Sequence, residues 1–101
     1  MEKQPTAAQQ TAHDLFQGGR LNESLRIFHR LCALTAGDPD VRLKIALIYE
    51  RQGEFLKAAE QYRVLAEHYL REGAILQSYE YYQTVLRLLP TDLDTLGRII
   101  G

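Results

Sequence analysis

The sequence lacks tryptophan and contains only one cysteine, one methionine and three prolines among its 101 residues. A disulfide needs two cysteines, so Cys32 cannot form one within the chain, and a lone thiol fits a reducing compartment. The first ten residues are polar and lack the apolar core of a secretory signal. We therefore expect a cytoplasmic protein.

Neither sign of charge dominates, and no long apolar run is present. Lys and Arg number 12 and Asp and Glu 13, a balance that argues against general binding to phosphate backbones. A membrane span needs about 20 consecutive apolar residues, and no run in the sequence reaches that length. Neither nucleic-acid binding nor membrane insertion is therefore expected.

Motifs for catalysis or cofactor binding are missing as well. The sequence contains no glycine-rich phosphate loop, nucleophile elbow or metal motif. His29 and Cys32 lie three residues apart and could share a helix face, but a zinc site needs three or four ligands. We expect a core cysteine and a surface histidine there, with no cofactor and no enzyme activity.

Helix-forming segments fill the rest of the chain. Apolar residues make up 46% of it and recur at helical spacing rather than in strict alternation. Glycines and prolines separate the segments, and Asp38 and Pro39 are expected to be the N-cap and the first residue of the third helix. The six predicted helices cover about residues 4–17, 21–35, from 39 to before Gly53, 54–71, 74–89 and 91–100.

Each predicted helix carries an apolar stripe that should face a neighbour. Leu34 belongs to the stripe of the second helix, and Ile75 and Tyr79 belong to that of the fifth. Because the connections are short, consecutive helices should be antiparallel neighbours. We therefore expect one all-α domain over residues 1–101, built from hairpins at about 5–35, 39–71 and 74–100.

A pattern of glycine, small residue and aromatic residue occurs twice along the chain with one constant spacing. The glycine permits a left-handed turn between two helices. The small residue lets the two helices approach closely, and the aromatic residue fills space beside the next hairpin. The repeating pairs are Gly19 and Gly53, Ser24 and Ala58, and Phe28 and Tyr62.

This spacing resembles the tetratricopeptide repeat, whose period is about 34 residues. The resemblance covers about residues 6–90 and is strongest over residues 41–66. A third copy of the pattern, Gly73, Ser78 and Tyr82, follows Gly53 by much less than one period, so the fourth helix should serve two hairpins. The resemblance implies a short solenoid of stacked hairpins with a right-handed superhelical tendency.

In this family the first helices of the hairpins line a concave groove that holds a peptide. The resemblance implies such a groove here, with a few apolar residues among charged ones, as partner recognition requires. The alternative interpretation is an ordinary solvated or packed helix surface. The implied groove residues are Gln9, Gln10, His13, Phe16 and Gln17 in the first hairpin and Leu43, Lys44, Leu47, Glu50 and Arg51 in the second.

Two further surfaces are candidates for contacts. Among the six tyrosines, Tyr81 is expected to be exposed, and tyrosine is enriched at interfaces. The last predicted helix is short and apolar, and no polar cap follows it. It could pair with a second copy, dock a different protein, precede further elements of a longer chain, or fold back to close the stack. Its apolar residues are Leu93, Leu96, Ile99 and Ile100.

The sequence therefore predicts a protein-interaction module: an adaptor, scaffold or chaperone-like subunit. It would bind a partner protein or peptide through the concave groove, the apolar C-terminal end, or both. The alternative is a structural domain that assembles with copies of itself within a longer protein.

Overall fold

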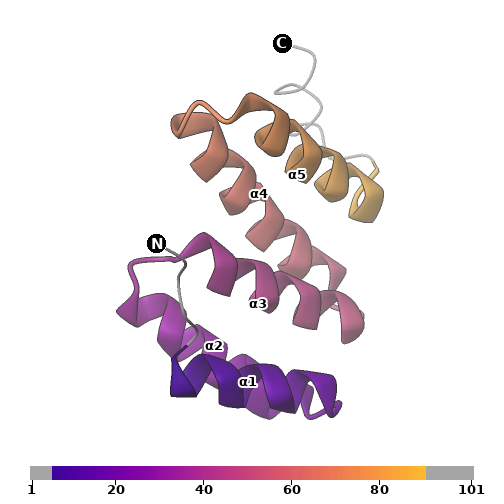
Figure 1. Cartoon of the computed structure of the whole chain (residues 1–101). Coiled ribbons are helices and arrows are strands. Elements are labelled where there is room, and N and C mark those ends of the chain that lie inside the picture. The colour runs from indigo at the N-terminus through magenta and orange to yellow at the C-terminus, as the bar shows by residue number, and fades with distance from the viewer. Residues whose placement is uncertain (1–5, 91–101) are drawn as a thin grey trace.

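The computed structural model describes residues 6–90, and this part of the chain consists of five α-helices without a strand (Figure 1). The expectation of an all-α fold is confirmed. The predicted sixth helix lies outside the described residues. The helices are α1 (Ala7–Gln17), α2 (Leu21–Leu34), α3 (Pro39–Arg51), α4 (Phe55–Arg71) and α5 (Ile75–Leu88).

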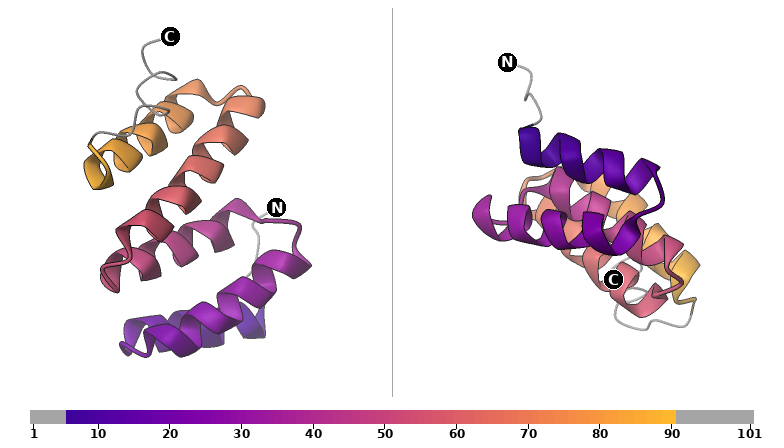
Figure 2. Two further views of the ribbon diagram at one scale, coloured as in Figure 1. Left: turned by 180° about the vertical axis from the view of Figure 1, so that it is seen from behind. Right: turned by 90° about the horizontal axis from the view of Figure 1, so that it is seen from below.

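The helices form a stack in which each one packs against the next along the chain. In Figure 1, α1 and α2 lie at one end of the stack, α3 and α4 in the middle, and α5 at the other end. The view from behind shows the same order (Figure 2, left). Contacts between residues far apart in the sequence are therefore made mainly between helices that follow each other in the chain.

The first and third helices begin at side-chain caps. Thr6 accepts a hydrogen bond from the backbone N–H of Gln9, whose side chain accepts one in return from the backbone N–H of Thr6. This reciprocal capping box satisfies two backbone donors, and α1 therefore begins at Ala7 instead of near residue 4. The expected cap at Asp38 is confirmed, because its carboxylate accepts from the N–H of Asp40 and Pro39 follows it.

The hairpins share one kind of turn. Gly19, Gly53 and Gly73 all have φ between 75° and 82°, a region that only glycine enters without strain. In each case the next backbone N–H donates to the carbonyl oxygen five residues before it, which is the C-terminal motif that ends a helix and reverses the chain. The left-handed turns predicted at these glycines are thus confirmed.

The small residues lie where paired helices approach most closely. The hydroxyl of Ser24 donates to the carbonyl oxygen of Ala12 at 2.7 Å, and that of Ser78 to the carbonyl of Ala66 at 2.8 Å. In both cases the serine and its partner are separated by the same sequence interval. Ala58, the corresponding residue between α3 and α4, is fully buried. The close approach predicted from these positions is confirmed.

Two apolar clusters make up the core. The first joins α1, α2 and α3 and includes Phe28, Cys32 and Ile45. The second joins α3, α4 and α5 and includes Leu65 and Val85. Helix α4 packs against both α3 and α5. It therefore belongs to two hairpins, as the short interval between Gly53 and Gly73 predicts.

Three residues assigned to core-facing stripes are in fact exposed. Leu34 is 77% exposed, Ile75 is 68% exposed and Tyr79 is 44% exposed. They lie on sides of α2 and α5 for which the described stack supplies no neighbouring helix. Among the described helices, none combines the length and apolar character that crossing a bilayer requires.

Candidate functional site

The implied groove on α1 and α3 exposes little apolar surface. Phe16 is only 8% exposed, and the guanidinium of Arg51 lies 4.2 Å from the centre of its ring. This is the geometry of a cation–π contact. The ring of Phe16 is therefore buried against Arg51, whereas Arg51 itself is exposed. That the two residues face a partner stays a prediction.

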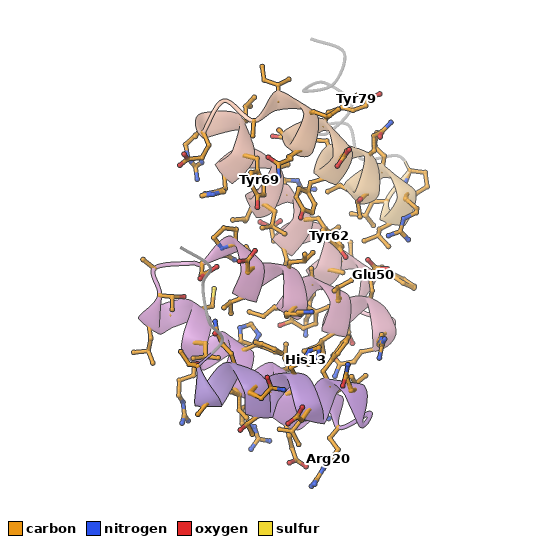
Figure 3. The ribbon with its side chains drawn as sticks, viewed as in Figure 1. His13, Arg20, Glu50, Tyr62, Tyr69 and Tyr79 are labelled. Atoms are coloured by element: carbon orange, nitrogen blue, oxygen red, sulfur yellow. The ribbon has the colours of Figure 1, made fainter. Side chains whose placement is uncertain are left out.

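The polar residues of the first hairpin differ in their contacts. Gln9 is held in the capping box, and the amide of Gln10 donates to the carboxylate of Asp14 on the same helix. Figure 3 shows His13 on the side of α1 toward α3, and it is half-buried. Gln17 is exposed at the end of α1.

The apolar residues of the second hairpin contribute mainly to the core. Leu43 packs against the second cluster and Leu47 against the first. Both are half-buried, and so is Lys44 between them. Most of the apolar surface that the resemblance assigned to a groove therefore lies within the stack.

Glu50 connects three helices instead of standing at a rim. Its carboxylate accepts a hydrogen bond from the hydroxyl of Tyr62 on α4 at 2.6 Å and one from Arg87 on α5 at 3.2 Å (Figure 3). Burial and the hydrogen bond to Glu50 raise the pKa of Tyr62 well above its usual value. Glu50, named among the implied groove residues, is therefore tied to Arg87 across the stack.

Tyr81 is not the exposed tyrosine. Its ring stacks between those of Tyr62 and Tyr69, with centroid distances of 6.0 and 5.6 Å, and burial is the main cause that raises its pKa. Sequence spacing correctly separates Tyr81 from Tyr82 but does not show that two rings of α4 enclose it. Tyr79 is the tyrosine of α5 that points away from the other helices (Figure 3).

His29 and Cys32 do not converge on a metal site. The Nε2 of His29 lies 2.9 Å from the hydroxyl of Tyr49 on α3, and burial followed by the charge of Arg42 lowers the pKa of His29. Cys32 is buried in the first cluster. Within residues 6–90, no group of three or more His, Cys, Asp or Glu side chains could hold a metal ion.

An exposed apolar patch surrounds the turn between α4 and α5. Leu70 comes from the last turn of α4, whereas Ile75, Leu76 and Tyr79 come from the start of α5. All four are exposed, and Leu76 reaches 71%. The last three share a helix face because Tyr79 lies three and four residues after the other two. We call these four residues the α4–α5 patch.

A second apolar surface lies at the opposite end of the stack, between α1 and α2. It is a groove with a volume of about 530 Å³. Its apolar lining comes from Ala8 and Leu15 on α1 and from Ile27, Leu31 and Leu34 on α2. We call it the α1–α2 groove.

The sequence of α2 indicates this groove, because the apolar residues of this helix form two rows and not one stripe. Ser24, Phe28 and Cys32 form one row on α2 and are buried. Ile27, Leu31 and Leu34, which are also spaced by about one helical turn, form a second row that lines the groove. An apolar face with two rows is wide enough for two neighbours, and the described stack covers only one of the rows.

The remaining candidate residues, Leu93, Leu96, Ile99 and Ile100, lie outside the described residues.

Neither a protein-family model nor a curated protein sequence matches the chain. The family resemblance consequently rests on the repeated spacing and on the turns and crossings that accompany it.

Proposed function

We propose that this protein is a protein-interaction module made of tetratricopeptide-type hairpins. Three observations support this type of hairpin. Two helix crossings share the same serine hydrogen bond, and a third crossing has buried alanines in its place. Three turns between helices have the same geometry. Stacked hairpins of this kind present surfaces for other proteins at their faces and ends. The module would act as an adaptor, scaffold or chaperone-like subunit.

The observation that carries this function is the α4–α5 patch. Four large apolar side chains gathered around one turn are more than the single exposed residues that every protein surface has. Their exposure costs free energy in water, and a partner that covers them recovers it. The patch therefore supplies the apolar centre that protein interfaces use.

A comparison of three tagged chains tests this function. The wild type is expected to retain a defined set of proteins from an extract of the cells that produce it. The double variant Ile75→Asp/Leu76→Asp should retain at least tenfold less of them, because two carboxylates prevent an apolar contact. Leu56→Asp serves as the matched control, since Leu56 is 74% exposed on α4 outside the patch.

The outcomes separate clearly when bound proteins are quantified by mass spectrometry. Retention by the wild type and the control, with loss in the double variant, supports the proposal. Equal retention by all three chains, or no retention above the tag alone, would rule it out. Circular dichroism of the double variant shows whether its helices are intact.

The second candidate is a structural domain that assembles with copies of itself. The exposure of four large apolar side chains near one turn favours it, because a two-fold pairing would bury the same patch on both chains. In that case the wild type would retain chiefly its own chain.

A further inference from the structure

We propose that the α1–α2 groove is a second docking site, and that its occupant is an amphipathic helix of a partner protein with acidic residues beside its apolar face. This inference goes beyond the proposed function because it concerns the other end of the stack. The α4–α5 patch and the α1–α2 groove are separate surfaces, so either proposal can fail alone.

The shape of the occupant follows from the internal repeat. Moving Thr11, Leu15 and Leu31 forward by the interval that separates Gly19 from Gly53 gives Ile45, Tyr49 and Leu65. In the second hairpin, these positions are covered by the preceding helix and its loop. Ile45 packs in a cluster with Phe28 and Cys32 of α2.

Two more contacts show the same covering. Tyr49 meets His29 of α2 at 2.9 Å. The loop that follows α2, at Ala36 and Gly37, lines a small cleft together with Leu65. Leu65, which also packs in the second cluster, is only 1% exposed, whereas Leu31, the corresponding residue of the first hairpin, is half-buried. The α1–α2 groove is thus the same face without its covering helix.

The dimensions of the groove suit a helix. Its lining on α2 extends from Glu23 to Leu34, which is about 16 Å along the helix axis at a rise of about 1.5 Å per residue. A segment of about three turns would span it. Helix α2, which covers the equivalent face of the second hairpin, has 14 residues.

The charge at the groove favours an acidic partner. Glu23, Arg26 and Arg30 border the apolar lining. Glu23 is neutralised by Arg20, whose guanidinium lies 2.6 Å from its carboxylate. Within residues 6–90, no ion pair or hydrogen bond is observed for the side chains of Arg26 or Arg30, which lie one turn apart on α2. Two such guanidinium groups beside an apolar surface complement carboxylates on an incoming helix.

A peptide made from the chain's own α2 provides a defined probe. The acidic peptide has the sequence of residues 21–34 with Arg26→Glu, Arg30→Glu and Cys32→Ser, and carries a fluorophore. The basic peptide has only the Cys32→Ser change. Both peptides carry the same change at Cys32 and keep Phe28, so they differ from each other only in the charge at positions 26 and 30. Fluorescence anisotropy measures their binding to the full chain.

The proposal predicts a charge preference that can be reversed. The wild type should bind the acidic peptide about tenfold more tightly than the basic one, because two exposed charge pairs together contribute about this much. The variant Arg26→Glu/Arg30→Glu should prefer the basic peptide. Leu34→Asp should weaken binding of the acidic peptide at least tenfold, whereas Leu76→Asp, a matched exposed leucine in the α4–α5 patch, should leave it within twofold.

Three results would overturn the proposal. The first is equal affinity of the wild type for the two peptides. The second is an equal loss of binding in Leu34→Asp and Leu76→Asp. The third is a wild-type dimer that Leu34→Asp dissociates, since a second copy would then occupy the groove. Loss of cell-derived partners in the double variant Ile75→Asp/Leu76→Asp, with peptide binding intact, would instead support both proposals.

Discussion

Replacing Ala58 by leucine is expected to destabilise the protein by about 3 kcal/mol, the upper part of the range for overpacking a filled core. Ala58 is fully buried between α3 and α4, and so is Ala46 in the same cluster. A leucine side chain has no space there unless the two helices move apart. Domains of this size have stabilities of about 5–15 kcal/mol, so a large part of the folding free energy would be lost.

Ala58→Ser is the matched control for this prediction. Serine already occupies the corresponding positions 24 and 78, where its hydroxyl donates to a carbonyl oxygen of the preceding helix. Ala46 stands in the same relation to Ala58 as Ala12 does to Ser24, so a bond to its carbonyl would compensate the burial of a hydroxyl. We expect a change of less than about 1 kcal/mol by the same mutational scale. Urea unfolding followed by circular dichroism measures both variants.

The Ala58 variants also test the internal repeat. A leucine variant as stable as the wild type would show that α3 and α4 do not cross closely at Ala58. A serine variant as unstable as the leucine variant would show that the third crossing is built differently from those at Ser24 and Ser78.

Truncation of two equivalent leucines should have unequal effects. Leu65→Ala is expected to cost about 3 kcal/mol, because it leaves a cavity at a residue that the second cluster and the loop after α2 enclose. Leu31→Ala should cost only about 1 kcal/mol, since its side chain is half-buried and water can fill the space it leaves. Thermal and urea unfolding of the two variants would give the difference.

This difference reports on the covering of the two hairpins. If the first hairpin resembles the second but lacks a helix over the α1–α2 groove, Leu31→Ala should lose less stability than Leu65→Ala, although both replace a leucine at the same position of the repeat. Equal costs would mean that Leu31 is enclosed in solution, and the α1–α2 groove would then not be open.

The sequence was sufficient to predict most of the helices. Glycine, proline and capping residues set their ends, and these signals act within a few neighbouring residues. The predicted start near residue 4 is wrong, because the capping box of Thr6 and Gln9 makes Ala7 the first residue of α1. The signal was present, since threonine followed by glutamine three residues later is a known form of this cap.

Contacts across helices were harder to predict. Periodicity shows that a residue lies on an apolar or polar face, but it does not show which neighbour that face meets. The resemblance assigns Glu50 to a groove, yet its carboxylate accepts hydrogen bonds from Tyr62 and Arg87 on two other helices. The prediction that Tyr81 is exposed is wrong, because its enclosure by Tyr62 and Tyr69 depends on how α5 packs on α4, which the spacing along α5 does not show.

The candidate surfaces were predicted only in part. The sequence indicated protein interaction through apolar helix surfaces, but it placed them in a concave groove and at the residues after Pro90. Among residues 6–90, the structure exposes large apolar side chains at Leu34 and around Ile75 and Leu76, whereas the residues after Pro90 lie outside the described part of the chain. Whether an apolar residue is covered depends on the presence of a neighbouring helix, and the periodicity of a single helix gives no information on that neighbour.

The solution mass of the wild-type chain, measured by light scattering over a hundredfold range of concentration, tests most directly whether the exposed surfaces serve a different protein. We expect a folded monomer of 11.6 kDa at every concentration, because we propose that the α4–α5 patch and the α1–α2 groove bind other proteins and not a second copy of this chain. A stable dimer that the Ile75→Asp/Leu76→Asp or Leu34→Asp variant dissociates would contradict this expectation and identify the chain as a self-assembly domain.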